Sequence, residues 1–174
     1  IDPITQVDPG PDQADPVVKI NYPTSVTILR DDAVKVPVKI QCEASDDIEL
    51  VSIVLKMDGT QIATFNSFKD YRRGVEEYIY DGVGDGKHTL EVTATDLAGK
   101  TSSQSVTFEK TTPYHALYEG EVFYMPFDGD AIEQISNTSA TVIGTPTYTD
   151  GKKVKAYTGA TGASLNFPTT GLLG

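Results

Sequence analysis

Hydrophobic and polar residues alternate with a period of two along much of the first 110 residues. In the clearest run, residues 34–44, the expected inward positions are Val34, Val36, Val38, Ile40 and Cys42. Such alternation predicts a strand with one buried face. Other short apolar or alternating runs cover residues 17–21, 25–30, 50–57, 61–65, 76–80, 88–95 and 101–108. Short strands without a helical period predict an all-β fold, with an antiparallel sandwich over residues 17–110.

Aspartate and glycine mark the turns between these runs. Asp58-Gly59 separates two apolar runs by two residues, which predicts a tight hairpin turn with positive φ angles. Another turn follows the run at 88–95, and Asp96 is expected to cap the backbone amides of that turn.

Residues 1–16 differ from the rest because prolines alternate with aspartates and few apolar side chains are present. Proline favours an extended backbone and like charges repel, so we expect a semi-rigid acidic stalk. An ordinary disordered terminus explains the same composition. A stalk before the first domain is typical of a mature lipoprotein, whose lipid anchor would lie upstream of residue 1 and provide the only membrane contact. No apolar run approaches the ~20 residues needed to cross a bilayer.

After a linker at 111–120, the chain changes to aromatic residues separated by glycines. Three runs are expected to be strands of a second β domain: 121–127, 153–157 and 163–167. This domain, 121–174, is expected to be incomplete and to expose an apolar face formed by Phe123, Met125 and Phe127. A second chain, strand exchange with another copy, or a longer chain would each supply the missing strands.

Two motifs resemble known domain families. One matches the pattern G-x-H-T-L-x-V-x-A-x-D-x-A-G of bacterial Ig-like domains, and its residues are Gly86, His88, Thr89, Leu90, Val92, Ala94, Asp96, Ala98 and Gly99. Asp46, Asp47 and the run that ends in Asp58-Gly59 match another part of that pattern. These residues specify an architecture and carry no chemistry.

The second motif resembles the opening of a laminin-G-like or concanavalin-like jelly-roll domain. It consists of Phe127-Asp128-Gly129, Gly144, Thr147-Tyr148, Gly151-Lys152 and Ala156-Tyr157. The chain departs from the family at Val154 and Lys155, where a glycine usually follows the lysine. A stalk, an Ig-like domain and this motif together resemble surface lipoproteins of Bacteroidetes polysaccharide-utilisation clusters. The resemblance implies an exported, lipid-anchored protein of the outer membrane or cell surface.

Charge and cysteine content narrow the range of partners. The formal net charge of −11 disfavours nucleic acid and anionic membrane surfaces. Acidity fits an exported protein that meets neutral ligands, and solubility alone explains it as well. The single cysteine, Cys42, excludes an intrachain disulfide, and its place in an alternating run predicts a buried, unreactive thiol.

The usual sequence signatures of enzymes are missing, including G-x-S-x-G, H-E-x-x-H and phosphate-binding glycine loops. Of the two histidines, His88 is expected at a strand edge and His115 in the linker. Glu76 and Glu77 are adjacent, so on a strand they would point to opposite faces rather than flank a cleft. We therefore expect no catalysis.

Calcium takes six to eight oxygen ligands, which pairs of aspartates can offer in part. The candidate pairs are Asp46 and Asp47, Asp81 and Asp85, and Asp128 and Asp130. Because lectin-like jelly rolls often carry a structural calcium near the sheet edge, the resemblance favours Asp128 and Asp130 as ligands. Turn carboxylates that cap backbone amides are the alternative explanation. No other cofactor is expected.

Residues 65–73, FNSFKDYRR, interrupt the sandwich pattern and are expected in a loop. Exposed aromatic rings that stack on sugars, beside polar groups that bind hydroxyls, are typical of carbohydrate sites. The predicted ligand-binding residues are Phe68, Asp70, Tyr71, Arg72 and Arg73. The alternative is that Tyr71 and Arg72 join the sandwich to the following domain.

These observations predict a non-catalytic, exported protein that binds and presents a polysaccharide or oligosaccharide. The sandwich would act as a spacer, and the second domain would carry most of the binding face. One alternative is a structural or adhesive cell-surface protein that uses the same domains for protein–protein contact. Another is an accessory region of a larger glycoside hydrolase.

Overall fold

A computed structural model describes residues 10–127, 130–152 and 155–168. The ordered elements in these ranges are all strands, which confirms the predicted all-β class. Within the described residues no helix has the length and apolarity to cross a membrane. The chain divides between Thr112 and Pro113 into two compact units, here named unit 1 and unit 2.

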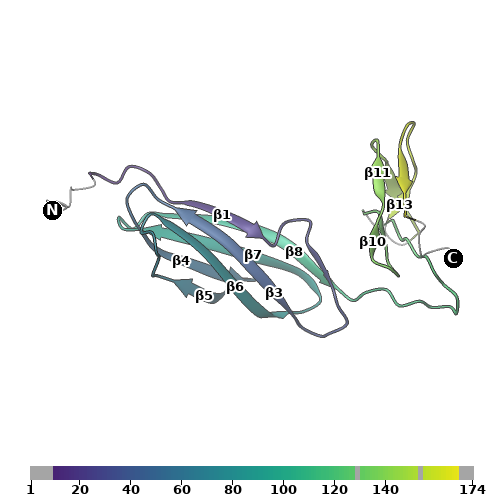
Figure 1. Cartoon of the computed structure of the whole chain (residues 1–174), viewed down its shortest axis with the longest axis horizontal. Coiled ribbons are helices and arrows are strands. Elements are labelled where there is room, and N and C mark those ends of the chain that lie inside the picture. The colour runs from purple at the N-terminus through teal and green to yellow at the C-terminus, as the bar shows by residue number, and fades with distance from the viewer. Residues whose placement is uncertain (1–9, 128–129, 153–154, 169–174) are drawn as a thin grey trace, which may run out of the picture. The chain divides into compact units, whose positions relative to one another are not determined.

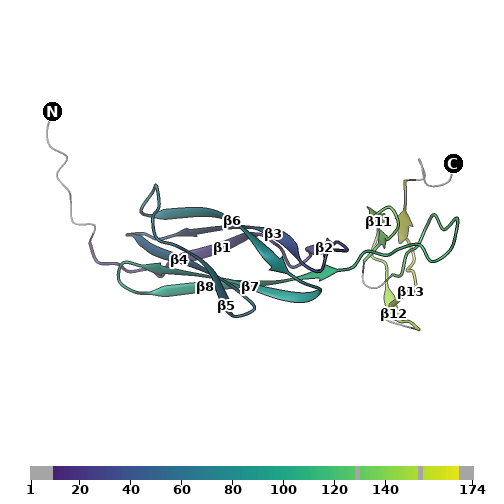
Figure 2. The ribbon, with the colours of Figure 1, turned by 90° about the horizontal axis from the view of Figure 1, so that it is seen from below.

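Unit 1 contains eight strands in two sheets that pack face to face (Figure 1, Figure 2). The strands are β1 Val17–Tyr22, β2 Ile28–Arg30, β3 Val36–Ser45, β4 Leu50–Met57, β5 Thr60–Phe65, β6 Arg73–Val83, β7 Gly86–Asp96 and β8 Thr101–Thr111. One sheet has the order β1-β3-β6, and the other has the order β2-β8-β7-β4-β5. This arrangement is a sandwich of the Ig or fibronectin-III kind.

The core of unit 1 follows from the period-two pattern. On β3, Val36, Val38, Ile40 and Cys42 are buried, and on β7 Val92 is buried as well. The facing residues of β4 and β8 complete the same cluster, and they include Ile53, Leu55 and Phe108. Burial of each large aliphatic side chain contributes about 1.5–3 kcal/mol. The predicted inward faces of these strands are therefore confirmed.

Three expectations for unit 1 are wrong. Val34 is 84% exposed, because β3 begins two residues later, at Val36. The predicted strand at 25–30 is reduced to β2, and β2 pairs with β8 in parallel, so the sandwich is not purely antiparallel. Strand β6 is longer than the predicted run at 76–80. Its exposed positions carry both polar and apolar side chains, so alternation in the sequence does not show where the strand begins and ends.

The predicted hairpin turn at Asp58-Gly59 and the predicted cap by Asp96 are both present. Asp58 and Gly59 have φ angles of 51° and 79°, as a two-residue hairpin turn requires. The backbone N–H of Lys100 donates to Asp96 Oδ1 at 2.7 Å, and the N–H of Gly99 donates to Asp96 O at 3.2 Å. The Asp96 carboxylate therefore holds the β7–β8 turn.

The described part of the predicted stalk lies against unit 1. Lys100 Nζ donates to Asp12 Oδ1 at 2.9 Å, to Asp12 O at 3.1 Å and to Ala14 O at 3.1 Å. Pro16 is fully buried. Asp12 and Ala14 of the expected stalk are therefore bonded to unit 1, while residues 1–9 lie outside the described residues.

Unit 2 contains six short strands that pair two by two. They are β9 Ile132–Glu133, β10 Thr138–Ser139, β11 Thr141–Ile143, β12 Tyr148–Asp150, β13 Lys155–Tyr157 and β14 Ser164–Asn166. The pairs are β9 with β10, β11 with β14, and β12 with β13. Strands β13 and β14 lie within predicted runs, although 153–154 fall outside the described residues. The described residues show no larger sheet here, so the predicted jelly roll is not seen.

The predicted strand at 121–127 is not formed. The backbone N–H of Tyr124 donates to the side-chain Oε1 of Glu133 at 2.9 Å instead of to a neighbouring strand. Phe127 has a φ of 60°, which an extended strand does not allow. The Glu133 side chain therefore helps to hold this segment. The alternating residues at 121–127 do not form an extended strand.

Glu133 is the only side chain of unit 2 that is fully buried in the described residues. Its Oε1 accepts the N–H groups of Tyr124 and Ile135, and its Oε2 accepts the N–H and the hydroxyl of Ser136, at 2.6–2.9 Å. Burial alone would raise the pKa of Glu133, but these hydrogen bonds outweigh it and lower the pKa to about 2. A buried carboxylate thus organises the segments around it.

Candidate functional site

The predicted binding segment lies in the connection between β5 and β6. Its backbone is held on the β3–β4 turn, because the Tyr71 carbonyl accepts the N–H of Leu50 at 2.7 Å and the Arg72 carbonyl accepts the N–H of Asp46 at 2.9 Å. Arg73 is the first residue of β6. The expectation of a loop is therefore correct for four of the five predicted residues, with Arg73 on a strand.

Phe68 anchors this loop rather than presenting an open face. Its ring packs against the core of unit 1 and covers Gly74. A Cβ atom at Gly74 would lie 2.8 Å from the Phe68 ring and 2.7 Å from Ile53 Cδ1, so only glycine allows this close approach. The Phe68 ring is therefore partly buried against the core rather than fully exposed.

Two of the predicted charged residues shape the segment. Asp70 Oδ1 accepts the N–H of Arg72 at 2.9 Å, and Asp70 O accepts the N–H of Arg73 at 3.1 Å. The side chain of Arg73 pairs with Glu43 across the sheet, with 2.6 Å between Nε and Oε1. Asp70 therefore closes the turn into β6, and Arg73 is fixed by its ion pair.

Tyr71 is the exposed aromatic residue of the loop. Its side chain is 56% exposed, and the guanidinium carbon of Arg72 lies 5.3 Å from the centre of its ring. A guanidinium at this distance over a ring makes a cation–π contact and restrains both side chains. Tyr71 and Arg72 thus form one preorganised exposed pair.

The same loop and the start of β6 line an open groove of about 460 Å³, to which Tyr71 and Arg72 do not contribute. It is lined by Ser67, Phe68, Lys69, Asp70, Arg73, Gly74, Val75 and Glu76. Three of the predicted residues, Phe68, Asp70 and Arg73, therefore line one groove. The lining contains cationic donors, anionic acceptors and the apolar side chains of Phe68 and Val75. This combination suits a hydroxyl-rich ligand.

The loop of Tyr71 and Arg72 and the exit of the chain from unit 1 lie at different places of the sandwich. Their loop is bonded to the β3–β4 turn, near the end of the sandwich where β8 begins. The chain leaves the sandwich at Thr111, where β8 ends beside β2. The loop therefore lies near the start of β8, and the chain leaves unit 1 at the end of β8.

Unit 2 has a groove of different character. It measures about 320 Å³ and is lined by Phe123, Met125, Phe127, Tyr157, Ala163, Ser164, Leu165 and Phe167. The Phe123 and Phe167 rings meet edge to face at 5.2 Å, and those of Phe127 and Tyr157 stack at 5.6 Å. The predicted apolar face is therefore present, although its residues lie in a loop and not on a strand.

The histidine of unit 1 has hydrogen-bond partners on both ring nitrogens, and its cysteine is buried. His88 Nδ1 lies 2.7 Å from Asp58 Oδ2, and His88 Nε2 lies 2.8 Å from Gly84 O. Burial, with a smaller effect of Glu76, raises the pKa of the Cys42 thiol to about 11, so the thiol stays protonated near neutral pH. Glu76 is half-buried and Glu77 is exposed, which agrees with side chains on opposite faces of β6.

The predicted metal ligands are not brought together in the described residues. Asp128 lies outside those residues, and Asp130 Oδ1 accepts the N–H of Ile132 at 3.1 Å, as in a capped turn. Asp85 pairs with the buried Lys110 at 2.6 Å, which explains its place without a metal. Asp47 is exposed.

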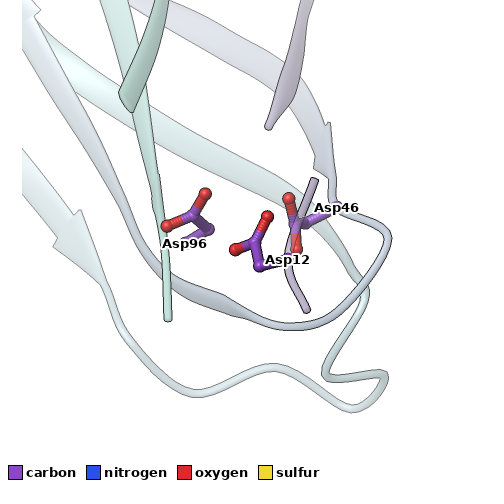
Figure 3. A group of neighbouring side chains, drawn as sticks. All are labelled: Asp12, Asp46 and Asp96. Atoms are coloured by element: carbon purple, nitrogen blue, oxygen red, sulfur yellow. The ribbon is translucent and has the colours of Figure 1, made fainter. Parts of the chain in front are cut away.

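A different set of carboxylates converges at one end of unit 1. Asp12, Asp46 and Asp96 lie close together, and one carboxylate oxygen of each lies within 4.8 Å of those of the other two (Figure 3). They come from the segment before β1, the β3–β4 turn and the end of β7. Sequence reasoning named Asp46 as a candidate calcium ligand but missed the set, because its members are 34 and 50 residues apart, Asp12 was assigned to the stalk and Asp96 to a turn.

Comparison with known proteins gives fold-level similarity. No protein-family model matches the chain, and no curated protein matches it. Among solved structures, the fibronectin(III)-like modules of Clostridium thermocellum CbhA align over 60% of this chain and 53% of theirs, with a TM-score of 0.45 and 21% identity. The chain thus spans about half the length of that structure.

Two further structures are similar to this chain. An engineered protein aligns over 56% of this chain and 20% of its own length, with a TM-score of 0.40 and 19% identity. SGBP-B of the Bacteroides ovatus mixed-linkage glucan utilization locus, solved with a mixed-linkage heptasaccharide, aligns over 91% of this chain and 41% of its own length. Its TM-score is 0.35 and its identity 14%.

Proposed function

We propose that this protein is a non-catalytic, exported glycan-binding protein of the cell surface, held there by a lipid anchor. The observation that carries the proposal is the groove lined by residues of the segment 67–76, together with the exposed Tyr71 in the same loop. Tyr71 provides an apolar ring for stacking on a sugar, and Lys69, Asp70 and Glu76 provide groups for its hydroxyls. In this proposal the sandwich contributes to binding and is not merely a spacer.

The absence of catalysis is part of the same proposal. His88 is occupied by Asp58 and Gly84, and Glu76 and Glu77 face opposite sides of one strand. Glycoside hydrolysis needs two carboxyl groups that face each other across a cleft. Of the two carboxylates that line the groove of unit 1, Asp70 is bonded to the N–H of Arg72 and closes the turn into β6, and Glu76 lies near the cationic Lys69 and Arg73 of the same lining.

Affinity electrophoresis of the full chain through gels that contain soluble polysaccharides tests the proposal. At least one neutral polysaccharide is expected to retard the protein, and Tyr71→Ala is expected to weaken binding about two- to tenfold, from the loss of one stacking contact. Tyr118→Ala removes a tyrosine of unit 2 that is also largely exposed, at 75%, and is the matched control. Retardation that Tyr71→Ala leaves unchanged would place the binding site elsewhere.

The groove of unit 2 favours a second candidate function, contact with another protein. Phe123 is 44% exposed, and most of the groove lining is apolar or aromatic with few hydrogen-bonding side chains. Such a surface is more typical of protein contacts than of sugar binding. Light scattering over a range of concentrations, with Phe123→Ser as the variant, would detect contact between copies of this chain.

A further inference from the structure

Asp12, Asp46 and Asp96 share an arrangement in which one oxygen of each carboxylate is bonded and the other is not. Asp46 Oδ1 accepts the N–H groups of Ile48 and Glu49, both at 2.9 Å. Asp96 Oδ1 accepts the N–H of Lys100, and Asp12 Oδ1 accepts Lys100 Nζ. In all three residues Oδ2 is buried and has no hydrogen-bond partner among the described residues.

These unbonded oxygens are unusual because buried polar atoms nearly always have a partner. Asp96 is only 1% exposed, and the side chain of Asp12 is 11% exposed. Removal of a carboxylate from water without a compensating partner is strongly unfavourable. Three such oxygens in one place point to a group that binds all of them.

The local charge points to a cation. The three carboxylates carry three negative charges, and Lys100 supplies one positive charge, which contacts Asp12. Lys100 Nζ has its three donors directed to Asp12 Oδ1, Asp12 O and Ala14 O, so none is left for Asp46 or Asp96. These four residues together therefore carry two negative charges, and Asp15 adds a further negative charge near Lys100, so the surroundings favour a divalent cation.

Distance and ligand type favour calcium. Oxygens bound to one Ca²⁺ at 2.3–2.6 Å can lie up to about 5 Å apart, and one oxygen of each residue falls within 4.8 Å of the other two. Mg²⁺, with bonds near 2.1 Å, limits that separation to about 4.2 Å and usually keeps several waters. Backbone carbonyls and water would complete a calcium coordination of six to eight.

We propose that Asp12, Asp46 and Asp96 bind a calcium ion that fastens the segment before β1 to the end of the sandwich. Asp46 and Asp96 belong to turns that the sandwich holds in place, whereas Asp12 belongs to the segment that was expected to be a stalk. The ion converts residues 10–16 from a tether into part of unit 1. This site is separate from the groove at 67–76 and from the predicted ligands Asp128 and Asp130.

Calorimetric titration of the metal-free full chain with CaCl₂, without any glycan, tests the proposal. We expect saturable binding with a Kd between about 10⁻⁶ and 10⁻³ M. Asp96→Asn and Asp46→Asn keep an oxygen for the local turn and remove the charge, so each is expected to weaken binding at least about tenfold. Asp47→Asn, an exposed neighbour of Asp46, is the matched control and is expected to bind as the wild type does.

A second readout keeps the test valid if an Asp96 variant folds poorly. Calcium is expected to slow hydrogen exchange of residues 10–16 in the wild type and to have no such effect in Asp12→Asn, whose substitution lies outside the sandwich strands. The proposal is overturned if the wild type binds no calcium up to about 10 mM, well above the weakest extracellular sites. Binding of wild-type affinity by Asp12→Asn and Asp96→Asn would also overturn it.

Discussion

Unit 1 and unit 2 are both built from β-strands, but different forces hold them together. Every buried apolar side chain of the described residues belongs to unit 1, where sheets of three and five strands enclose it. In unit 2 the buried side chain is the carboxylate of Glu133, and the strands only form pairs. Strand-like sequence alone therefore does not produce a sandwich, because an apolar face also needs a second sheet to cover it.

The difference has an energetic consequence. Many buried side chains stabilise unit 1, and each contributes about 1.5–3 kcal/mol. Because these side chains pack in one cluster, we expect unit 1 to unfold as a single cooperative unit. Unit 2 depends on a few hydrogen bonds to one carboxylate, each of which contributes about 1.5–3 kcal/mol. We therefore expect the two units to unfold separately and to respond to different substitutions.

The largest effect is expected from a cavity in the core of unit 1. Leu90→Ala removes a fully buried side chain and should lower the free energy of unfolding of unit 1 by about 2–4 kcal/mol. Leu97→Ala makes the same chemical change at a side chain that is 60% exposed, and is expected to change it by less than about 0.5 kcal/mol. Urea denaturation followed by NMR measures both, and equal effects would show that β7 is wrongly oriented.

A comparable but more local effect is expected in unit 2. Glu133→Gln replaces one acceptor oxygen by an NH₂ group that faces backbone N–H donors, which should destabilise unit 2 by about 2–3 kcal/mol. Glu119→Gln, at an exposed position of the same unit, is the matched control. Chemical shifts of residues 124 and 132–138 should change in the first variant only, while those of unit 1 stay the same.

Low pH is also expected to affect the stability of unit 2 through Glu133. The pKa of Glu133 falls from 4.5 to about 2 on folding, so the ionised group stabilises unit 2 fully above about pH 4.5. That contribution, about 3 kcal/mol, is lost as the pH falls from about 4.5 to 2. Unit 2 resonances of the wild type should lose dispersion in this window. A pH response unchanged in Glu133→Gln would count against the role of this carboxylate.

The smallest effect is expected from a polar contact of unit 1. Burial lowers the pKa of His88, but its hydrogen bonds to Asp58 and Gly84 O outweigh burial and raise the pKa above 6.5. Protonated His88 therefore stabilises unit 1 below pH 6.5, and this contribution is lost as the pH rises through the raised pKa. Since Asp58 is half-exposed, the effect should stay below about 1 kcal/mol. Thermal unfolding of His88→Gln should lack this pH dependence.

The core of unit 1 could be predicted from sequence because a single rule decides it. Period-two alternation places Val38 and Val92 inward, and both are buried in the structure. The same rule fails at Val34, which lies outside β3, and at Phe123, where no strand is formed and the N–H of the next residue, Tyr124, donates to the Glu133 side chain. Alternation identifies a face that can be buried, but not whether a partner exists to bury it.

Sites that depend on tertiary structure were harder to predict. The composition of residues 65–73 indicated the loop, but the inward position of Phe68 depends on the gap that Gly74 leaves below its ring. The acidic cluster needs three distant segments to meet, and its members Asp46 and Asp96 each have an adequate local explanation as turn residues. No sequence signal connects the three aspartates. The contact between Lys100 and Asp12 that brings the segments together becomes visible only in the folded chain.

Hydrogen–deuterium exchange of the intact chain at neutral pH tests the central claim, that an apolar core holds unit 1 and a buried carboxylate holds unit 2. We expect strong protection in β3, β4, β7 and β8, and weak protection in unit 2 except for amides near Glu133, such as those of Ile135 and Ser136. In Glu133→Gln the unit 2 protection should disappear while unit 1 is unchanged. Uniform strong protection across residues 121–167 that survives Glu133→Gln would contradict this account.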